Sequence, residues 1–234
     1  MPRVYSNDAP RRAAAECLLE GMLEAGLASI HRVAPAPPLP ATTSSAEALS
    51  LGLIAAAVAS CQNCDLWRNR TTAVPGEGHA AARLMFVGLA PGAEEDRLGR
   101  PFVGPAGQLL DKIIENGMKL TRSEVFFSNL VKCRPLHDGA PQEQEVALCS
   151  NYLTQQIHAI QPELIIALGL PAAQFLLQTS APIAAIRGKI HQRPQDGPPI
   201  LVTDHPASLL LEPSRKAECW ADIQVAMRFL GLPA

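Results

Sequence analysis

The sequence predicts an α/β fold, a three-layer sandwich in which helices flank a central sheet of four parallel strands. Four short apolar runs carry this prediction, at residues 83–88, 124–129, 163–169 and 200–204. Helical patterns separate these runs, and strands that alternate with helices are typical of a parallel sheet covered on both faces.

Helices are expected at 106–118, 142–160, 171–178 and 214–230. The segment 142–160 has the clearest pattern, because five apolar side chains recur there at helical spacing. They form one stripe of Val146, Cys149, Leu153, Ile157 and Ile160. Such a stripe is the face that a helix buries against a sheet.

The chain before residue 47 has a different character. Residues 12–30 carry Leu18, Met22 and Leu23 at helical spacing, which predicts a short amphipathic helix. A tract rich in Pro, Ala, Ser and Thr then predicts a stiff linker, and a second helix is expected over 46–59. We therefore expect a helical extension at 1–33, a linker at 34–46 and one α/β domain at 47–234.

Composition limits the class of protein. The 234 residues are 47% hydrophobic and carry a formal net charge of -2, so nucleic-acid binding would require basic residues gathered on one face. The first residues lack the apolar core of a secretory signal, and no apolar run approaches the ~20 residues of a membrane span. We expect a cytoplasmic monomer with reduced cysteines.

Unusual sequences follow three of the predicted strands: "GLAPGAEED", "SNLVKCRP" and "DHPASLLL". The carboxyl ends of parallel strands form the usual ligand crevice, so one site is expected to collect all three. In the first turn, Gly88 and Gly92 allow close backbone approach. Pro91 separates this turn from the dinucleotide fingerprint. A plain strand-to-helix connection is the alternative.

Phe102 lies in the Gly/Pro-rich stretch "GRPFVG". An aromatic ring in such a loop is placed to stack on a planar ligand, and the alternative is that it covers the core. The backbone amides near Ala90 and Gly92 are candidates for holding negative charge.

Four of the six cysteines are candidates for a metal centre. Cys61 and Cys64 form a C-x2-C pair, while Cys133 and Cys149 follow in the second strand-end motif and in the next helix. Four thiolates suit a [4Fe–4S] cluster and equally suit tetrahedral zinc. Cys17 and Cys219 lie in helical patterns, where a cysteine is usually a small buried apolar residue.

These motifs, together with "GRPFVGPAGQLL", resemble the family 4 uracil-DNA glycosylases over roughly residues 58–232. The chain departs from the family in having Leu89 where a glutamate usually stands; the related family 5 enzymes carry Gly-Leu-Ala-Pro there. Ser208 and Leu211 also stand at variable or altered positions.

The resemblance implies a DNA-repair enzyme. Its reaction would hydrolyse the N-glycosidic bond of deoxyuridine in single- or double-stranded DNA by base flipping, releasing uracil and leaving an abasic site. It also favours the [4Fe–4S] cluster over zinc at Cys61, Cys64, Cys133 and Cys149, with a structural role.

The resemblance implies three roles at the base. Phe102 stacks on uracil, and Asn129 offers one donor and one acceptor to uracil O4 and N3–H. His205 donates to uracil O2 as negative charge moves onto the leaving base. Backbone groups at Gly88, Ala90 and Gly92 are further contacts, and Glu95 is the carboxylate left for the sugar and the attacking water.

The same resemblance, together with charge and exposure, gives a set of expected DNA contacts. They are Arg187, Lys189 and His191 in the segment "IRGKIH", and Ser208, Leu209 and Leu210 in a Leu-rich loop that fills the space left by the flipped base. The alternative for this segment is that Leu209, Leu210 and Leu211 begin a buried helix. Arg100, Lys132 and Arg134 would extend a basic lip.

Three alternatives remain open. Leu89 favours a uracil-DNA-binding protein with weak or no turnover. Covalent trapping of uracil-DNA through His137 is the second alternative, although the loop around it is short and lacks a basic insertion. The third is a scaffold that binds a repair or replication partner through its N-terminal helix.

Overall fold

The computed structural model describes residues 45–193 and 197–233. These residues belong to one compact unit, 37–234. The expected N-terminal extension and nearly all of the expected linker lie outside the described residues. The first described helix, α2, spans Ser45–Ala59 and so includes the last two residues that were assigned to the linker.

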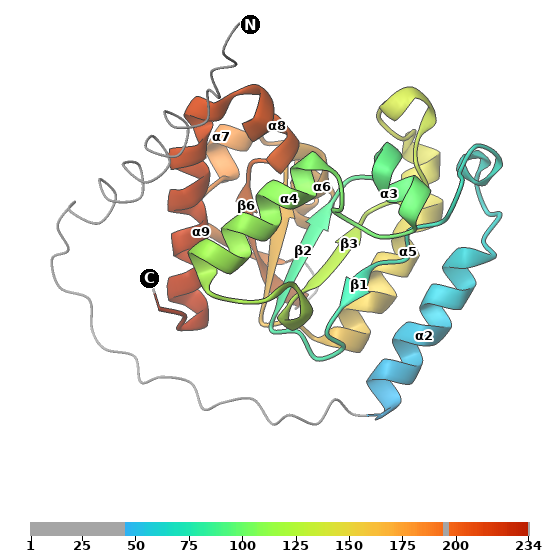
Figure 1. The fold of residues 1–234 in the computed structure, drawn as a ribbon, viewed down its shortest axis with the longest axis horizontal. Coiled ribbons are helices and arrows are strands. Elements are labelled where there is room, and N and C mark those ends of the chain that lie inside the picture. Colours follow the sequence, from blue (N-terminus) through green and yellow to red (C-terminus); the bar gives the residue numbers. More distant parts are fainter. Residues whose placement is uncertain (1–44, 194–196, 234) are drawn as a thin grey trace, which may run out of the picture. The chain divides into compact units, whose positions relative to one another are not determined.

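The four predicted strands form the parallel centre of the sheet (Figure 1). They are β2 (Leu84–Gly88), β3 (Phe126–Asn129), β4 (Leu164–Leu168) and β6 (Gly197–Thr203). Their order is β3-β2-β4-β6, and each neighbouring pair is parallel. The predicted α/β fold with a central parallel sheet between helices is therefore confirmed.

The number of strands needs a correction, because the described chain has a six-stranded sheet in the order β1-β3-β2-β4-β6-β5. The added strands, β1 (Glu77–Gly78) and β5 (Ile190–Arg193), are antiparallel and lie at the two edges. One has two residues and the other is mostly polar. Short and polar edge strands limit unwanted pairing with other chains, and they lack the apolar runs that reveal buried strands.

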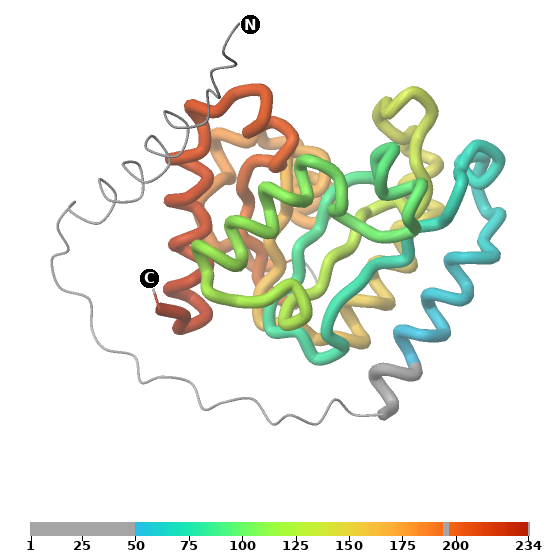
Figure 2. Tube along the Cα trace, in the orientation of Figure 1, coloured from blue at the N-terminus to red at the C-terminus, as the bar shows by residue number. Residues whose placement is uncertain are grey.

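Helices cover both faces of the sheet (Figures 1 and 2). One face carries α4 (Pro105–Lys112), the π-helix η2 (Ile113–Met118), α8 (Pro206–Leu211) and α9 (Lys216–Leu230). The other carries α5 (Glu143–Ile160), α6 (Leu170–Leu177) and α7 (Ile183–Ile186). Helix α2 packs against α5, and α3 (Ala93–Leu98) follows β2.

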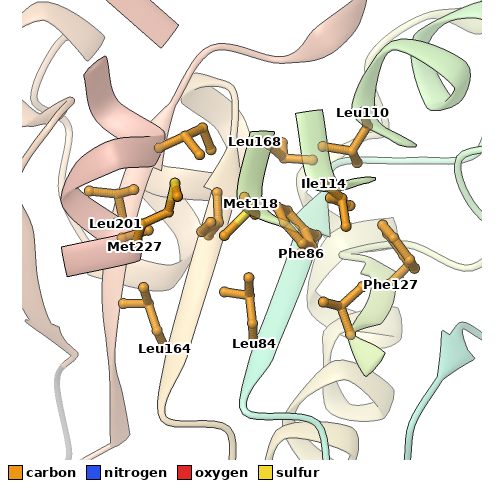
Figure 3. Close-up of a cluster of buried hydrophobic side chains, with 14 of the residues drawn as sticks. Leu84, Phe86, Leu110, Ile114, Met118, Phe127, Leu164, Leu168, Leu201 and Met227 are labelled. Carbon is orange, nitrogen blue, oxygen red and sulfur yellow. The ribbon is translucent and has the colours of Figure 1, made fainter. Parts of the chain in front are cut away.

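The larger core lies between the sheet and the helices α4 and α9 (Figure 3). Phe86 and Phe127 stack on neighbouring strands with ring centroids 5.5 Å apart. Leu110 and Met227 approach from the covering helices and are 1% exposed. Burial of one such side chain contributes about 1.5–3 kcal/mol, so this core fixes the strand ends above it.

Short turns of 3-10 helix complete the described chain: η1 (Asp65–Arg68), η3 (Arg122–Glu124), η4 (Leu136–Asp138) and η6 (Pro213–Arg215). No helix within the described ranges combines the length and the apolar character needed to cross a membrane.

Candidate active site

A cavity of about 610 Å³ lies at the carboxyl ends of the parallel strands. This volume falls in the usual range for a small-molecule site, about 300–1,000 Å³. Segments from all four central strands line it, as the sheet topology predicts. Among the residues expected at the site, the lining includes Ala90, Gly92, Glu95, Phe102, Asn129, His205 and Ser208.

Gly88 sits beneath this cavity, at the end of β2 opposite Asn129. A Cβ atom at position 88 would lie 2.5 Å from Asn129 Oδ1 and 2.8 Å from Phe102 Cζ. Both distances are too short for real contacts. A glycine is therefore required at this position for the amide and the ring to approach each other.

Phe102 is held in a strained backbone conformation. Its φ is 52°, a left-handed value that non-glycine residues adopt rarely. Arg122 donates from Nη1 to the Phe102 carbonyl at 3.1 Å, donates to the Pro101 carbonyl, and lies 4.1 Å from the centroid of the Phe127 ring. The Phe102 ring packs against Phe127 at 5.9 Å. Arg122 therefore fixes both the loop and the ring behind it.

Asn129 ends β3 and is 3% exposed. Its backbone carbonyl accepts a 2.8 Å hydrogen bond from Lys132 Nζ. Lys132 is 1% exposed, and burial lowers the pKa of its ammonium to about 7. The side-chain amide of Asn129 lines the cavity, where it can offer a donor and an acceptor together.

His205 is the N-cap of α8, and its Nδ1 accepts from the Ala207 N–H at 3.2 Å. Burial lowers the pKa of His205, and the nearby carboxylate of Glu95 partly opposes this effect. In the neutral ring, an accepting Nδ1 leaves the proton on Nε2. The ring centroid lies 6.0 Å from that of Phe102. The site thus holds a neutral imidazole that can donate from Nε2.

Glu95 binds backbone amides on both sides of the cavity wall. Its Oε2 accepts from Gly92 N–H, and its Oε1 accepts from Val103 and Gly104 N–H, each at 3.2 Å. The carboxylate therefore ties the turn after β2 to the loop that follows Phe102. Leu89 also lines the cavity, and its half-buried side chain packs on the α5/α6 side of the sheet.

Arg187 is not among the residues that line the cavity, and it pairs with carboxylates, one of which, Asp204, does line it. Its guanidinium meets Asp204 at 2.9 Å, Glu218 at 2.7 Å and Asp222 at 2.8 Å. A phosphate at Arg187 would compete with these three acidic groups for the guanidinium, and the expected phosphate contact stays a prediction. Lys189 is exposed at the start of the β5 edge, and His191 Nε2 lies 2.6 Å from the Ile186 carbonyl oxygen.

The expected basic lip also changes. Lys132 is buried, Arg100 pairs with Glu77 at 2.6 Å, and Arg134 pairs with Asp138 at 2.7 Å. The two arginines keep exposed surface, but each already has an acidic partner. The sequence shows these charges but does not show which residues pair. Arg100 and Glu77 lie 23 residues apart, and Arg134 and Asp138 meet across a turn.

The Leu-rich segment is the helix α8 and not a loop, with His205 as its N-cap. Leu209 is 1% exposed and belongs to the core, which corrects its expected contact with DNA. Leu210 is 43% exposed and Leu211 is 85% exposed. The helical turn sends one leucine inward because α8 must cover the sheet, and the other two remain at the surface.

Several residues of the cavity lining were not anticipated, and two of them form an ion pair. Asp204 and Arg215 line the site, and Arg215 Nη2 donates to Asp204 Oδ1 at 2.6 Å. The position of Asp204 at the end of the last apolar run, directly before His205, is the signal that marks it. Arg215 gives no such signal, because its place depends on how η6 turns back after α8.

The four expected cluster cysteines line a second, small cavity beside Lys132. Cys133 and Cys149 are buried, whereas Cys61 and Cys64 are half-buried. Arg70 Nη1 lies 3.1 Å from Cys133 Sγ, and the Lys132 N–H lies 3.2 Å from Cys149 Sγ. Amide and guanidinium donors of this kind favour sulfur atoms that carry negative charge.

The chemistry of this donor set fits a thiolate-ligated centre, since four sulfurs surround one largely apolar space. Burial raises the pKa of the Cys133 thiol and raises that of Cys149 to about 11. A metal would have to displace these protons. The four thiols thus share one cavity but would have to move closer together to bind a metal, since across the described residues no three His, Cys, Asp or Glu side chains converge closely enough to hold an ion.

Comparison with known proteins assigns the chain. A profile of the uracil DNA glycosylase superfamily matches residues 75–224, which include the whole wall of the larger cavity. The chain belongs to the uracil-DNA glycosylase superfamily. The matched segment begins just before β1 and ends within α9.

Within this superfamily, the chain is similar to several proteins called type-4 uracil-DNA glycosylases. It is 46% identical to that of Saccharolobus solfataricus over 70% of this chain and 79% of the relative. It is 43% identical to that of Sulfurisphaera tokodaii over 70% and 78%, and 41% identical to that of Pyrobaculum aerophilum over 74% and 90%.

Proposed function

We propose that this protein is a uracil-DNA glycosylase that hydrolyses the N-glycosidic bond of deoxyuridine in DNA, releasing uracil and leaving an abasic site. The observation that carries the proposal is the convergence of Phe102, Asn129 and His205 on one cavity at the strand ends. The names of its type-4 relatives support the same reaction.

The deoxyuridine must leave the base stack to reach this cavity. Extrusion of a nucleotide costs roughly a few kcal/mol, and an apolar wedge that fills the vacated space offsets part of that cost. Leu210 and Leu211 on α8 supply exposed apolar surface beside the cavity, and Ser208 lies at its wall. Lys189 keeps an exposed ammonium for a phosphate.

Asn129 selects the base. Its amide offers a donor to uracil O4 and an acceptor to N3–H, whereas cytosine presents the opposite pattern at these atoms. A cytosine would therefore leave buried polar groups unpaired, at a cost of roughly several kcal/mol. Phe102 stacks on the selected ring, and Gly88 leaves the room that both contacts need.

His205 assists departure of the base. As the glycosidic bond lengthens, electrons move onto uracil, and a donor at O2 binds this state more tightly than the ground state. Because Nδ1 accepts the Ala207 N–H, the proton of the neutral ring lies on Nε2. Nε2 is therefore the atom that donates to uracil O2. Depression of the His205 pKa by burial keeps the imidazole neutral at physiological pH.

Glu95 serves the sugar side of the reaction. Its carboxylate carries negative charge beside the cavity, which favours the positive charge that develops on the sugar. Three backbone amides use most of its acceptor sites. Its contribution is thus electrostatic, and water attacks the sugar without a strong general base, because position 89 holds a leucine.

Cys61, Cys64, Cys133 and Cys149 would hold a [4Fe–4S] cluster. When bound, it would crosslink the segment that precedes η1, the segment that joins β3 to α5, and α5 itself, which carries Cys149. Iron and sulfide analysis of the purified protein, with its visible absorption, tests this assignment. A colourless protein with one zinc per chain would replace it with the zinc alternative.

Incubation with uracil-containing single- and double-stranded oligonucleotides tests the reaction. The expected result is strand breakage after alkali at the uracil position and at no other base. His205→Asn is the matched control, since asparagine preserves an N-cap but removes the Nε2 donor. A type-4 relative assayed in parallel is the positive control. If the relative produces alkali-labile breaks and this protein produces none, the proposal is contradicted.

Leu89 supports a second candidate function. This residue lines the cavity at the position where the family usually has a glutamate, so the cavity wall lacks that carboxylate. The protein would then bind uracil-DNA with weak turnover, seen as a mobility shift without strand breaks. A covalent complex resistant to SDS would instead indicate trapping through His137, which lies in η4 with a φ of 55°.

A further inference from the structure

Lys132 extends its side chain into the interior behind the uracil cavity. The ammonium donates to Ser128 Oγ at 2.6 Å, to the Asn129 carbonyl at 2.8 Å and to Gln156 Oε1 at 2.8 Å. Its side chain is one of the largest fully buried ones in the described chain. A lysine that fills all three donors with acceptors in this way is fixed in position.

One of these contacts fixes the peptide that joins Asn129 to Leu130. Lys132 Nζ holds the carbonyl of this peptide, and Gly88 O accepts from its N–H at 2.9 Å. A peptide group held at both polar atoms cannot rotate about its own axis. The direction in which the Asn129 side chain leaves the backbone is therefore set jointly by Lys132 and by strand β2.

The ammonium is itself anchored to a rigid helix. Gln156, on the buried face of α5, accepts from Lys132 Nζ and from Ser128 Oγ, and its Nε2 donates to the Pro75 carbonyl at 2.5 Å. All these donors and acceptors are buried or half-buried. Because unpaired buried polar groups are costly, the network permits one arrangement of Lys132.

We propose that Lys132 is a positioning residue that orients Asn129 for the selection of uracil. The proposal rests on the role assigned above to Asn129, and it adds a residue that does not touch the base. A recognition group is useful when a second layer of contacts holds it to within about 0.5 Å of its working geometry. Lys132 supplies that layer for Asn129.

Loss of the ammonium should weaken recognition and leave the cavity in place. In Lys132→Met, the alkyl chain still fills the interior, but the Asn129 carbonyl loses its donor. We expect kcat/KM for uracil in single-stranded DNA to fall about 10-fold. Inhibition by free uracil should weaken by a similar factor, because the free base meets the same amide.

A double-mutant cycle separates positioning from a general structural effect. Asn129→Ala should lower kcat/KM about 100-fold, and Lys132→Met in that background should change it by less than about 3-fold. Ser128→Ala is the matched control. It removes the hydroxyl that bonds Lys132 Nζ and Gln156 Oε1 and lies 3.4 Å from the Asn129 carbonyl oxygen, but it retains the 2.8 Å bond from Lys132 Nζ to that oxygen. It should stay within about 3-fold of wild type.

Two results would overturn the positioning role: multiplicative losses in the double variant, or wild-type kinetics and uracil inhibition in Lys132→Met. If Lys132→Met does not fold, Gln156→Leu replaces it, because it removes the acceptor that anchors Nζ. Gln156→Leu should lower kcat/KM in the wild-type background and should leave kcat/KM nearly unchanged in the Asn129→Ala background. Wild-type activity of Asn129→Ala would instead refute the assigned role of Asn129 itself.

Discussion

The uracil cavity and the cysteine cavity are neighbours, since Ala90 lines the first and packs beside the cysteines of the second. Their polar groups are held differently. In the uracil cavity, backbone amides bind the carboxylate of Glu95 and Nδ1 of His205. In the cysteine cavity, apolar packing surrounds the sulfurs, and two donors reach Cys133 and Cys149.

This difference separates two ways of building a site. Backbone hydrogen bonds give the uracil cavity its geometry before any ligand arrives, so its recognition groups are preorganised. Thiols held by packing have the right neighbours but need a bound group to draw them to one point. The first cavity should therefore lose activity when a side chain changes, and the second should lose stability.

The largest expected effect comes from the cysteine cavity. Cys133→Ala should abolish the visible absorption of the proposed cluster and lower the unfolding temperature by about 10 °C, as expected when loss of a metal centre costs more than about 4 kcal/mol. Cys219→Ala is the matched control, because it removes another buried thiol. Equal melting temperatures for the two variants would contradict the expectation that the cysteine cavity contributes to stability through a bound group.

The next effect comes from His205. His205→Asn should lower kcat by about 100-fold or more, since one donor to a developing anion contributes about 3 kcal/mol. The melting temperature and the cluster absorption should stay near wild type, because asparagine still caps α8. Single-turnover rates measure the change, and a normal rate would show that Nε2 does not face the base.

Glu95→Gln should have a smaller effect, lowering kcat/KM about 10-fold. The amide NH2 replaces an oxygen that accepts backbone N–H groups, so the wall near Gly92 and Val103 loosens. Glu94→Gln is the control, because Glu94 pairs with Arg97 at the surface. If both variants have the same kcat/KM, the backbone contacts of Glu95 do not support the site.

The pH dependence of stability isolates one titration. Burial lowers the pKa of His205, whereas a histidine in the unfolded chain titrates near about 6.5. Below about pH 6.5 the unfolded chain binds a proton at His205 that the folded protein does not bind. The contribution of the neutral His205 to the free energy of unfolding is therefore complete above about pH 6.5 and is lost as pH falls toward the folded-state pKa. Urea unfolding of wild type should weaken more steeply with acid than that of His205→Asn. Parallel curves would contradict this origin.

Leu89→Glu should have the smallest effect, a gain in kcat of less than about 10-fold. The added carboxylate would lie on the cavity wall, where it can order the attacking water. Leu89→Gln has a similar shape without the charge and should show no gain. If Leu89→Glu has a lower kcat than wild type, the leucine itself supports the reaction and its replacement of the glutamate does not limit the rate.

The sequence predicted the centre of the fold because buried parallel strands are continuous apolar runs. The edge strands β1 and β5 give no such run, since solvent covers one side of them. Motif residues at the ends of strands, such as Asn129 and His205, were expected to lie at one cavity, and both line it. The surroundings of Lys132 and Arg187 were not predicted, because they depend on partners that are distant in the sequence: Gln156 beside Lys132 and Asp222 beside Arg187.

The bare backbone at Gly88 has a consequence for substitutions at this position. Asn129 Oδ1 and Phe102 Cζ both lie in the space that a side chain there would take. A methyl group at position 88 would press on both, so one substitution on β2 would disturb two residues of the cavity lining that come from different segments.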